Sequence, residues 1–244
     1  MIDVRALRRD FGGIHALGGV DLRVDPGERR AVIGPNGAGK TTLFNVLTGE
    51  LRASGGTMRL GDTDIGALTT WQRARLGLAR MYQRNELFDP LSARENLLLS
   101  VTSLGSAYRA FRSPGAREVA EANAVLDRVG LADRGSVPAR ALSHGERRQL
   151  ELALALARRP RVLLLDEPTA GLSPGETERI AALIAGLDRS LTLLIVEHDM
   201  DVVFRLADRI TVLHEGRAIA EGTPDEVRGD RQVHDVYLGK AVEA

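Results

Sequence analysis

The sequence predicts an α/β protein built on a sheet of parallel strands. Residues 162–165 and 191–196 are continuous apolar runs, as expected of strands that are covered on both faces. Helical patterns follow both runs, at residues 174–187 and 200–207. Strands that alternate with helices in this way are typical of α/β architecture.

The N-terminal part adds two strands and a helix to this pattern. Residues 20–24 alternate apolar and polar side chains, as a half-buried strand does, and the dipeptide Pro26-Gly27 predicts a turn after it. Residues 31–33 form a short apolar run before a glycine-rich stretch, and a helical pattern follows at 41–47. A strand, a glycine-rich loop and a helix are therefore expected in succession.

The C-terminal part predicts a hairpin, and the middle of the chain predicts helices. Residues 210–213 and 218–220 flank Glu215-Gly216, a turn signal between two short strands. Residues 90–159 are mainly helical in pattern, with a loop expected at 103–115. We therefore expect a helical segment inserted between the strands of the sheet.

Composition excludes several classes of protein. The chain has 244 residues, 33 basic and 33 acidic groups and no cysteine. Zero net charge argues against a sequence-blind nucleic-acid binder, which needs a basic face. The chain has no apolar run long enough for a membrane-spanning helix and no N-terminal secretory signal. Without cysteine a disulfide scaffold and thiol chemistry are excluded, and the five histidines have no partners at metal-ligand spacing.

A phosphate-binding loop is the strongest motif in the sequence. Residues 34–41 fit the pattern G-x-x-x-x-G-K-[ST]. The glycines let backbone N–H groups converge on phosphate oxygens, and the N-terminus of the following helix adds its positive dipole. The expected phosphate-binding residues are Gly34, Pro35, Asn36, Gly37, Ala38, Gly39, Lys40, Thr41 and Thr42. A glycine-rich turn without a ligand is the alternative, and the strand before and the helix after disfavour it.

The use of lysine supports this interpretation. Lys40 and Lys240 are the only lysines among the 33 basic residues, and Lys240 lies in the tail. A compact ammonium on a flexible stem fits a tight phosphate cradle where a planar guanidinium does not. Lys40 is therefore expected to reach the β- and γ-phosphates, while the hydroxyl of Thr41 is expected to coordinate Mg²⁺.

Two carboxylates end the strand predicted at 162–165. Asp166 lies at the carboxyl end of the strand, where it could hold Mg²⁺ through water. Glu167 points in a different direction and could orient or deprotonate an attacking water. A pair that caps the following helix is the alternative, and the phosphate-binding loop favours the catalytic interpretation.

The strand at 191–196 ends in Glu197, His198 and Asp199. Asp199 is expected to cap the helix that begins near residue 200, which leaves His198 for another role. Parallel strands end at one edge of a sheet, where ligands bind at the switch in strand order. We therefore expect Lys40, the two carboxylates and His198 at one edge, with Glu167 and His198 as the catalytic residues.

A capping box precedes an apolar helical pattern in the middle of the chain. Ser143 is the expected N-cap, and Glu146 three residues later completes the box. A capped helix N-terminus that also carries glycine, here Gly145, can bind an anion as well. Both roles can hold together.

Four motifs occur in an order that resembles the ATP-binding subunit of ABC transporters: GPNGAGKT, LSHGE, LLLDEP and the histidine after IVE. The resemblance covers essentially the whole chain. It implies an ATPase with ATP and Mg²⁺ as cofactors. It also implies a dimer in which the signature loop of one subunit closes on the nucleotide held by the other.

The resemblance also implies a fold. It predicts a P-loop ABC ATPase core with a mixed sheet, an antiparallel β subdomain and an inserted α-helical subdomain. Residues 1–244 are then one ABC ATPase domain. Residues 1–89 and 160–244 form its nucleotide-binding core, and residues 90–159 form the helical signature subdomain.

Further site residues follow from the resemblance alone. Ser143, His144, Gly145 and Glu146 match the signature, in which Ser143 and Gly145 face the γ-phosphate of the partner's nucleotide. The usual signature is LSGGQ, so His144 and Glu146 depart from it. Gln83 matches the glutamine loop that touches Mg²⁺ and senses the transmembrane partner. Phe11 lies where the family places an aromatic residue on adenine, and a core or turn phenylalanine is the alternative.

The type of transporter rests on weaker features. Residues 11–13, 84–88, 170–173 and the tail at 222–239 resemble ATPases of branched-chain amino-acid importers, and LSHGE is similar to the urea importers. Lipopolysaccharide-type exporters have a similar tail. A soluble ABC ATPase of repair or translation is a third alternative, but the chain holds one cassette and no long coiled coil. A regulator that does not hydrolyse nucleotide is expected to lack Glu167 or His198, and both are present.

The resemblance also implies the partners and the location. We expect transmembrane permease subunits, a second ATPase subunit that is identical or paralogous, an extracytoplasmic substrate-binding protein acting indirectly, and no nucleic acid. The chain is then a peripheral protein on the cytoplasmic face of the membrane. Leu87 and Phe88 follow the glutamine loop and are candidates for the docking surface, with subdomain core as the alternative.

Overall fold

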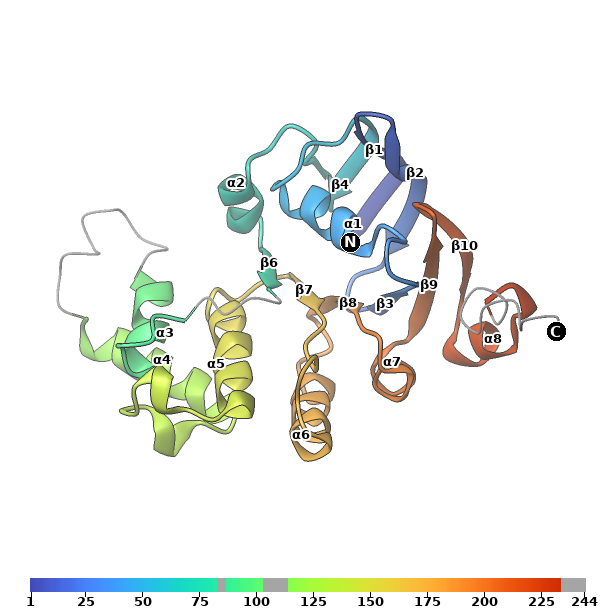
Figure 1. The fold of residues 1–244 in the computed structure, drawn as a ribbon. Helices are drawn as coiled ribbons and strands as arrows, with labels where there is room; N and C mark the ends of the chain where they lie inside the picture. The colour runs from blue at the N-terminus through green and yellow to red at the C-terminus, as the bar shows by residue number, and fades with distance from the viewer. Residues whose placement is uncertain (83–86, 103–113, 234–244) are drawn as a thin grey trace.

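The computed structural model describes residues 1–82, 87–102 and 114–233, and its larger sheet has the strand order β10-β9-β3-β8-β7-β6 (Figure 1). The strands of this sheet are β3 (Arg29–Ile33), β6 (Leu78–Met81), β7 (Val162–Asp166), β8 (Thr192–Val196), β9 (Arg209–His214) and β10 (Arg217–Gly222). Strand β10 is antiparallel to β9, and all the other pairings in the sheet are parallel. The mixed sheet and the C-terminal hairpin confirm the prediction.

A second, antiparallel sheet covers the N-terminal part of the chain in the order β2-β1-β4-β5. Its strands are β1 (Ile2–Phe11), β2 (Ile14–Val24), β4 (Gly55–Leu60) and β5 (Thr63–Asp64). Local patterning predicted only the end of β2. Strand β1 carries a bulge at Ala6, where φ is +46°, and two exposed residues separate the buried Val4 and Leu7. The bulge breaks the period of two that marks a strand in a sequence.

Eight α-helices are found in the described ranges. They are α1 (Lys40–Thr48), α2 (Thr70–Arg75), α3 (Ala93–Thr102), α4 (Ala116–Arg128), α5 (His144–Ala157), α6 (Pro174–Ala185), α7 (Met200–Leu206) and α8 (Pro224–Gly229). Helices α3, α4 and α5 lie between β6 and β7 in the chain and pack on one another beside the sheet (Figure 1). None of the described helices is long and apolar enough to cross a membrane.

The apolar strands are buried because each face of the larger sheet packs against a different layer. Leu164 and Leu194 point into a core shared with α1 and the antiparallel sheet. Leu163, Leu165 and Leu193 point into a second core shared with α3 to α6. This two-sided burial explains the continuous apolar runs of β7 and β8, and it fixes the strand ends that carry the site.

Candidate functional site

Three neighbouring parallel strands deliver the expected polar residues to one edge of the larger sheet. Strand β3 leads into the glycine-rich loop and Lys40, β7 ends at Asp166, and the loop after β8 carries His198. Asp166 lies opposite Val196 in the β7–β8 pairing. The charges of Glu167 and Asp166 act on the Lys40 ammonium. The structure therefore brings these residues together as the sequence predicts.

The glycine-rich loop opens onto an uncapped helix N-terminus. Gly39 is the N-cap of α1 with φ +102°, and a Cβ there would lie 2.6 Å from the carbonyl oxygen of Ala16. Gly37 has φ +81°, and a Cβ there would meet nothing within 4 Å, so the loop is open on this side. No side chain caps α1, and its first turn holds no acidic residue. Its first N–H groups are thus available to an anion.

Lys40 is held inside this loop by backbone oxygens. Its Nζ donates to the carbonyls of Gly34 at 2.6 Å and Pro35 at 3.0 Å, and the residue is 6% exposed. Burial lowers the pKa of Lys40, and the charges of Glu167 and Asp166 act in the opposite direction. The ammonium is positioned by the loop itself and could exchange a carbonyl for a phosphate oxygen.

Asp166 has a buried partner that the sequence does not reveal. Nη2 of Arg80, on β6, donates to Oδ2 of Asp166 at 2.6 Å, and both side chains are almost fully buried. Nη1 of Arg80 donates to Oδ1 of Asn45 on α1 at 2.6 Å. Arg80 therefore links the carboxylate to the helix that follows the phosphate loop. A charged residue in the short strand LARM was the only sequence signal for it.

The residues at this edge fit Mg²⁺ by the chemistry of their donors. The carboxylate of Asp166 and the hydroxyl of the exposed Thr41 are hard oxygen ligands, which Mg²⁺ prefers. In the described part of the chain, no group of three or more His, Cys, Asp or Glu side chains could hold a metal. Mg²⁺ bound by one or two protein oxygens takes its remaining ligands from substrate phosphates and water.

Glu167 is held in a strained backbone conformation. Its φ is +48°, which costs a non-glycine residue about 1–3 kcal/mol and persists only where the surroundings enforce it. The N–H of Glu167 donates to the carbonyl of Val196 at 2.8 Å, and its own carbonyl accepts from Arg148 Nη2 at 2.6 Å. Its Oε1 lies 3.0 Å from Nε2 of His198. The turn thus aims the carboxylate at the histidine.

The loop that carries His198 is tied to the turn after Glu167 by Glu197. Oε1 of the buried Glu197 accepts from the backbone N–H of Thr169 at 2.9 Å and from its hydroxyl at 2.5 Å. Oδ1 of Asp199 accepts from the N–H of Asp201 at 3.0 Å and caps α7, as predicted. Sequence reasoning missed the role of Glu197, because Thr169 lies on a different strand connection.

The geometry of His198 gives a testable expectation. Its side chain is about half exposed, so replacing it leaves no buried cavity, and it contacts Glu167. His198→Ala is therefore expected to lower the rate of ATP hydrolysis by about 10²-fold while ATP affinity changes little. Steady-state turnover and equilibrium nucleotide binding measure the two effects. Equal losses in both would show that His198 only packs.

The signature residues make their own set of hydrogen bonds at the N-terminus of α5. Oγ of Ser143 accepts from the N–H of Glu146 at 3.2 Å, and the Glu146 carboxylate accepts from the N–H of Ser143 at 2.8 Å, so the capping box is present. The N–H of Gly145 donates to Oε1 of Glu176 on α6 at 2.9 Å. His144 is exposed. In the described structure, no hydrogen bond or ion pair joins these residues to Lys40 or Glu167.

Two other expected residues stay untested by the geometry. Gln83 lies outside the described residues. Phe11, at the end of β1, is 43% exposed, and the guanidinium of Arg9 lies over its ring at 4.3 Å from the centroid. It is therefore a surface residue rather than a core one, and its contact with adenine stays a prediction.

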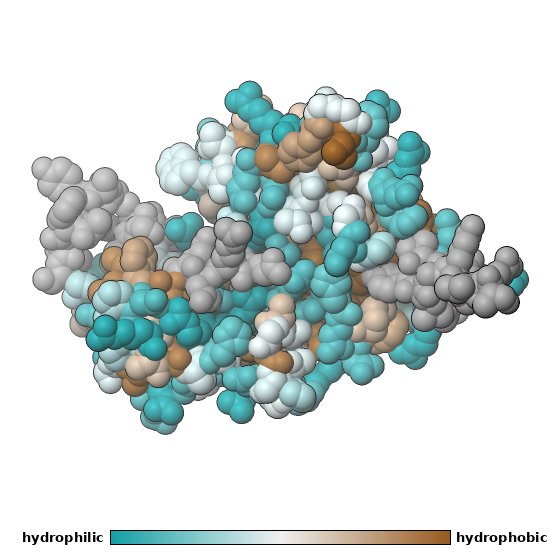
Figure 2. All heavy atoms as spheres, viewed as in Figure 1, coloured by the Kyte–Doolittle hydropathy of each residue, from teal (hydrophilic) through white to brown (hydrophobic). Residues whose placement is uncertain are grey.

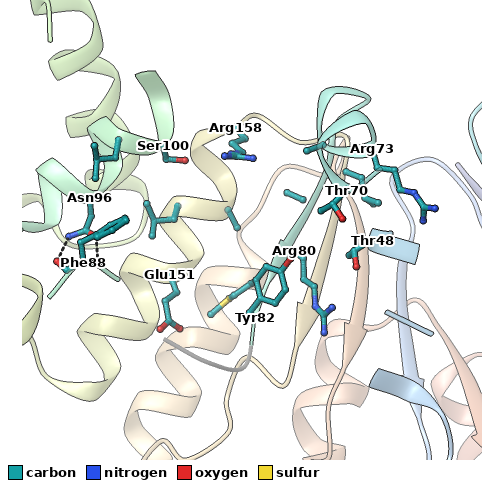
Figure 3. A pocket seen from close by; sticks show the side chains of 17 residues that line it. Thr48, Thr70, Arg73, Arg80, Tyr82, Phe88, Asn96, Ser100, Glu151 and Arg158 are labelled. Carbon is teal, nitrogen blue, oxygen red and sulfur yellow. Dashed lines mark hydrogen bonds between the residues drawn. The ribbon is translucent and has the colours of Figure 1, made fainter. Parts of the chain in front are cut away.

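A groove of about 580 Å³ separates the sheet from the helical insert (Figure 3). The groove is lined by Arg80 on β6, by Tyr82 directly after β6, by Phe88, and by Glu151 on α5. The N–H of Phe88 donates to Oδ1 of Asn96 at 2.8 Å, and Nδ2 of Asn96 donates to the carbonyl of Phe88 at 3.2 Å. The backbone is thus fixed while the Phe88 side chain is 59% exposed.

Comparison with known proteins decides the family. The sequence profile of the ABC transporter family matches residues 17–170. The chain belongs to the ABC transporter family. A second profile, named branched-chain amino acid ATP-binding cassette transporter, matches residues 219–243. This chain is 39% identical to the high-affinity branched-chain amino acid transport ATP-binding protein BraF of Pseudomonas aeruginosa, over 99% of this chain and 98% of BraF. The corresponding LivG of Escherichia coli K12 gives the same values.

Solved structures agree with this family. A nucleotide-free ATP-binding cassette from an ABC transporter matches with a TM-score of 0.88 and 29% identity, over 98% of this chain and 99% of that one. A cassette in its ADP conformation matches with a TM-score of 0.89 and 30% identity over the same shares. The chain is therefore an ABC ATPase that binds nucleotide, and the predicted α/β cassette fold is confirmed.

Proposed function

We propose that the site at the edge of the larger sheet hydrolyses ATP and thereby drives the import of branched-chain amino acids. The observation that carries the proposal is the convergence of Lys40, Asp166 and the Glu167–His198 pair beside the uncapped N-terminus of α1. These are a cation, a metal-binding carboxylate and a base next to an anion site. That combination suits phosphoryl transfer to water.

Each residue has a role in this proposal. The N–H groups of α1 and the Lys40 ammonium hold the phosphates. Asp166 and Thr41 would hold Mg²⁺, with Gln83 expected beside them, and the metal would supply positive charge against the phosphates. Glu167 takes the proton of the attacking water or orients that water, and His198 keeps the carboxylate in place. Arg80 bonds Oδ2 of Asp166, so Oδ1 is the oxygen that would face the metal.

The second half of the site comes from a partner subunit in this proposal. Ser143 and Gly145 lie at the N-terminus of α5 and, among the described residues, make no hydrogen bond or ion pair to Lys40 or Glu167 of their own chain, so they would serve the nucleotide of a second ATPase subunit. A dimeric bacterial ABC transporter cassette matches with a TM-score of 0.80 and 25% identity, over 92% of this chain. The second subunit is identical or paralogous.

The transported substrate rests on the relatives. BraF and LivG are named as subunits of branched-chain amino acid transport, and the profile match at residues 219–243 agrees with them. The test is ATPase activity of the chain assembled with its permease and substrate-binding protein in lipid vesicles. Leucine, isoleucine or valine is expected to stimulate hydrolysis. Stimulation by urea alone, or by none of these, would contradict branched-chain amino-acid import.

The groove between the sheet and the insert is the proposed docking surface for the permease. Leu87 packs against the core of the insert, whereas the Phe88 side chain faces the groove together with the 44% exposed Leu99. Apolar side chains also gather on the surface over α3 and α4 (Figure 2). A permease segment in this groove would hold the chain on the cytoplasmic face of the membrane as a peripheral subunit.

If the permease docks in this groove, a charge at Phe88 should abolish membrane binding of the chain. Phe88→Asp is expected to release the chain from vesicles that carry the permease, because it places a charge among apolar contacts. Because Phe88 is exposed, the isolated chain should keep its circular dichroism spectrum and its thermal midpoint. Ile14→Asp is the matched control, since Ile14 is 71% exposed on the antiparallel sheet, far from the groove in sequence and fold. Retention of the Phe88 variant on the vesicles would exclude this surface.

A further inference from the structure

Arg148 is a buried arginine whose donors are all occupied. It lies on α5 and is 6% exposed. Its Nε donates to the carbonyl of Pro168 at 2.8 Å, and Nη2 donates to the carbonyls of Glu167 at 2.6 Å and Asp166 at 3.3 Å. Nη1 donates to the carbonyl of Tyr82 at 3.1 Å and to Oε2 of Glu151 at 2.7 Å. These five bonds match the five N–H groups of a guanidinium.

Three of these acceptors belong to one turn. Residues 166–168 follow β7 and contain the metal-side carboxylate and the proposed base. Glu167 is the residue of this turn with positive φ, and its carbonyl accepts the shortest of the five bonds. A strained residue needs an enforcing contact. Arg148 is the one described side chain that donates to that carbonyl, which also accepts from the backbone N–H of Ala170 at 3.1 Å.

We propose that Arg148 is a positioning residue for hydrolysis: its guanidinium holds the 166–168 turn so that the Glu167 carboxylate faces His198 and the attacking water. This inference rests on the proposed function of Glu167 as the base. All five donors of Arg148 are bonded to protein oxygens, so it acts through the backbone of the turn. The role requires the planar fork of an arginine, because a lysine ammonium cannot reach carbonyls on both sides of the turn.

The position of Arg148 on α5 also links the signature helix to the 166–168 turn. Arg148 lies one helical turn after Gly145, on the helix whose N-terminus carries the signature. It also bonds Tyr82, the residue before the glutamine loop, and Glu151, which borders the groove. The same guanidinium therefore joins the signature helix and the groove to the turn that carries the base. The helix that reads the partner's nucleotide cannot shift without affecting its own Glu167.

The test separates positioning from binding and from folding. Arg148→Met keeps the apolar stem of the side chain and removes all five bonds. It is expected to lower kcat by about 10²-fold, the cost of misplacing a catalytic group by about 1 Å. The ATP dissociation constant, measured with a fluorescent ATP analogue, is expected to stay within about threefold, since Lys40 and the phosphate loop are untouched. Arg148→Lys keeps the buried cation and is expected to give an intermediate kcat.

Arg147→Met is the matched control. Arg147 is the preceding residue on α5, and it bonds Asp89, the last residue before the insert, at 2.7 Å and the carbonyl of Ala139, within the insert, at 3.1 Å. Its loss is expected to leave kcat unchanged. Equal losses of kcat in the two methionine variants would overturn the proposal, as would a parallel loss of ATP affinity in Arg148→Met. If Arg148→Met does not fold, Arg148→Lys decides. A wild-type kcat in Arg148→Lys would then overturn the proposal, and a lowered kcat with unchanged ATP affinity would support it.

A last variant distinguishes the inference from the proposal on which it rests. Glu167→Gln tests the base itself: normal turnover in that variant would refute the proposed function whatever Arg148 does. Arg148→Met added to Glu167→Gln is expected to keep ATP-dependent dimerisation, because the Ser143–Glu146 capping box does not involve Arg148. Loss of the dimer would mean that Arg148 acts through the signature helix, and the positioning role would be wrong.

Discussion

Replacing Glu167 with glutamine is expected to lower ATP turnover by about 10³-fold while ATP stays bound. Glutamine keeps the size of the side chain and an oxygen for the contact with His198, but its amide cannot accept the proton of water. Lys40 and the N–H groups of α1 are unchanged, so the nucleotide is still held. If ATP joins two subunits, a subunit that cannot hydrolyse it should accumulate as a dimer, because a ligand bound only by the dimer shifts the equilibrium by mass action.

Light scattering measures this outcome directly. Glu167→Gln is expected to be dimeric with ATP and Mg²⁺ and monomeric with ADP. Adding Ser143→Arg should abolish the dimer, because the new side chain fills the N-terminus of α5 where the partner's γ-phosphate would bind. Where the natural partner is a paralogous chain, the mixed pair is measured. A monomer under all conditions, with that partner supplied, would refute the shared site.

Lys40→Ala is expected to weaken ATP binding by about 10²-fold and to reduce hydrolysis below detection. A hydrogen bond to a charged group contributes about 1.5–3 kcal/mol, and the ammonium of Lys40 would make more than one to the phosphates. Because burial lowers the pKa of Lys40, the unliganded chain gains little from holding this charge. The variant is therefore expected to fold with an unchanged or higher thermal midpoint.

Lys40→Arg is the sharper form of the same prediction. The positive charge remains, but the guanidinium is wider than the ammonium that Gly34 and Pro35 enclose at 2.6 and 3.0 Å. Hydrolysis should fail in this variant too, as measured by phosphate release. Lys240→Ala controls for the loss of a lysine elsewhere in the chain. Wild-type turnover in Lys40→Arg would show that the loop needs only a charge and that the cradle argument is wrong.

The sequence predicted the parts of the fold that depend on continuous segments. Strands β7 and β8 were predicted because both of their faces are buried, and the phosphate loop was predicted because its chemistry needs glycines and a lysine at fixed spacing. The capping roles of Ser143 and Asp199 were also predicted, since a cap acts within one helical turn. Strand β1 was missed because the bulge at Ala6 interrupts its alternation.

The contacts that position the site could not be predicted in the same way. Arg80 and Asp166 are separated by 86 residues, and Arg148 and Glu167 by 19. Arginine is by far the commoner basic residue of this chain, so one more arginine in a strand or helix carries no signal. Only the fold shows which of them are buried against the carboxylates and carbonyls of the catalytic turn.

The bond between Gly145 and Glu176 ties the N-terminal turn of α5 to the core. The N-terminal turn of α5 is attached to the core twice, by Gly145 to α6 and by Arg148 to the turn after β7. Both attachments lie within one helical turn, while Glu146 and Arg147 in the same turn bond Arg134 and the carbonyl of Ala139 in the insert. If the insert reorients relative to the core, we expect it to turn about this end of α5. Displacement would then grow with distance from this end of the helix, so we expect α3 and α4 to move further than Ser143.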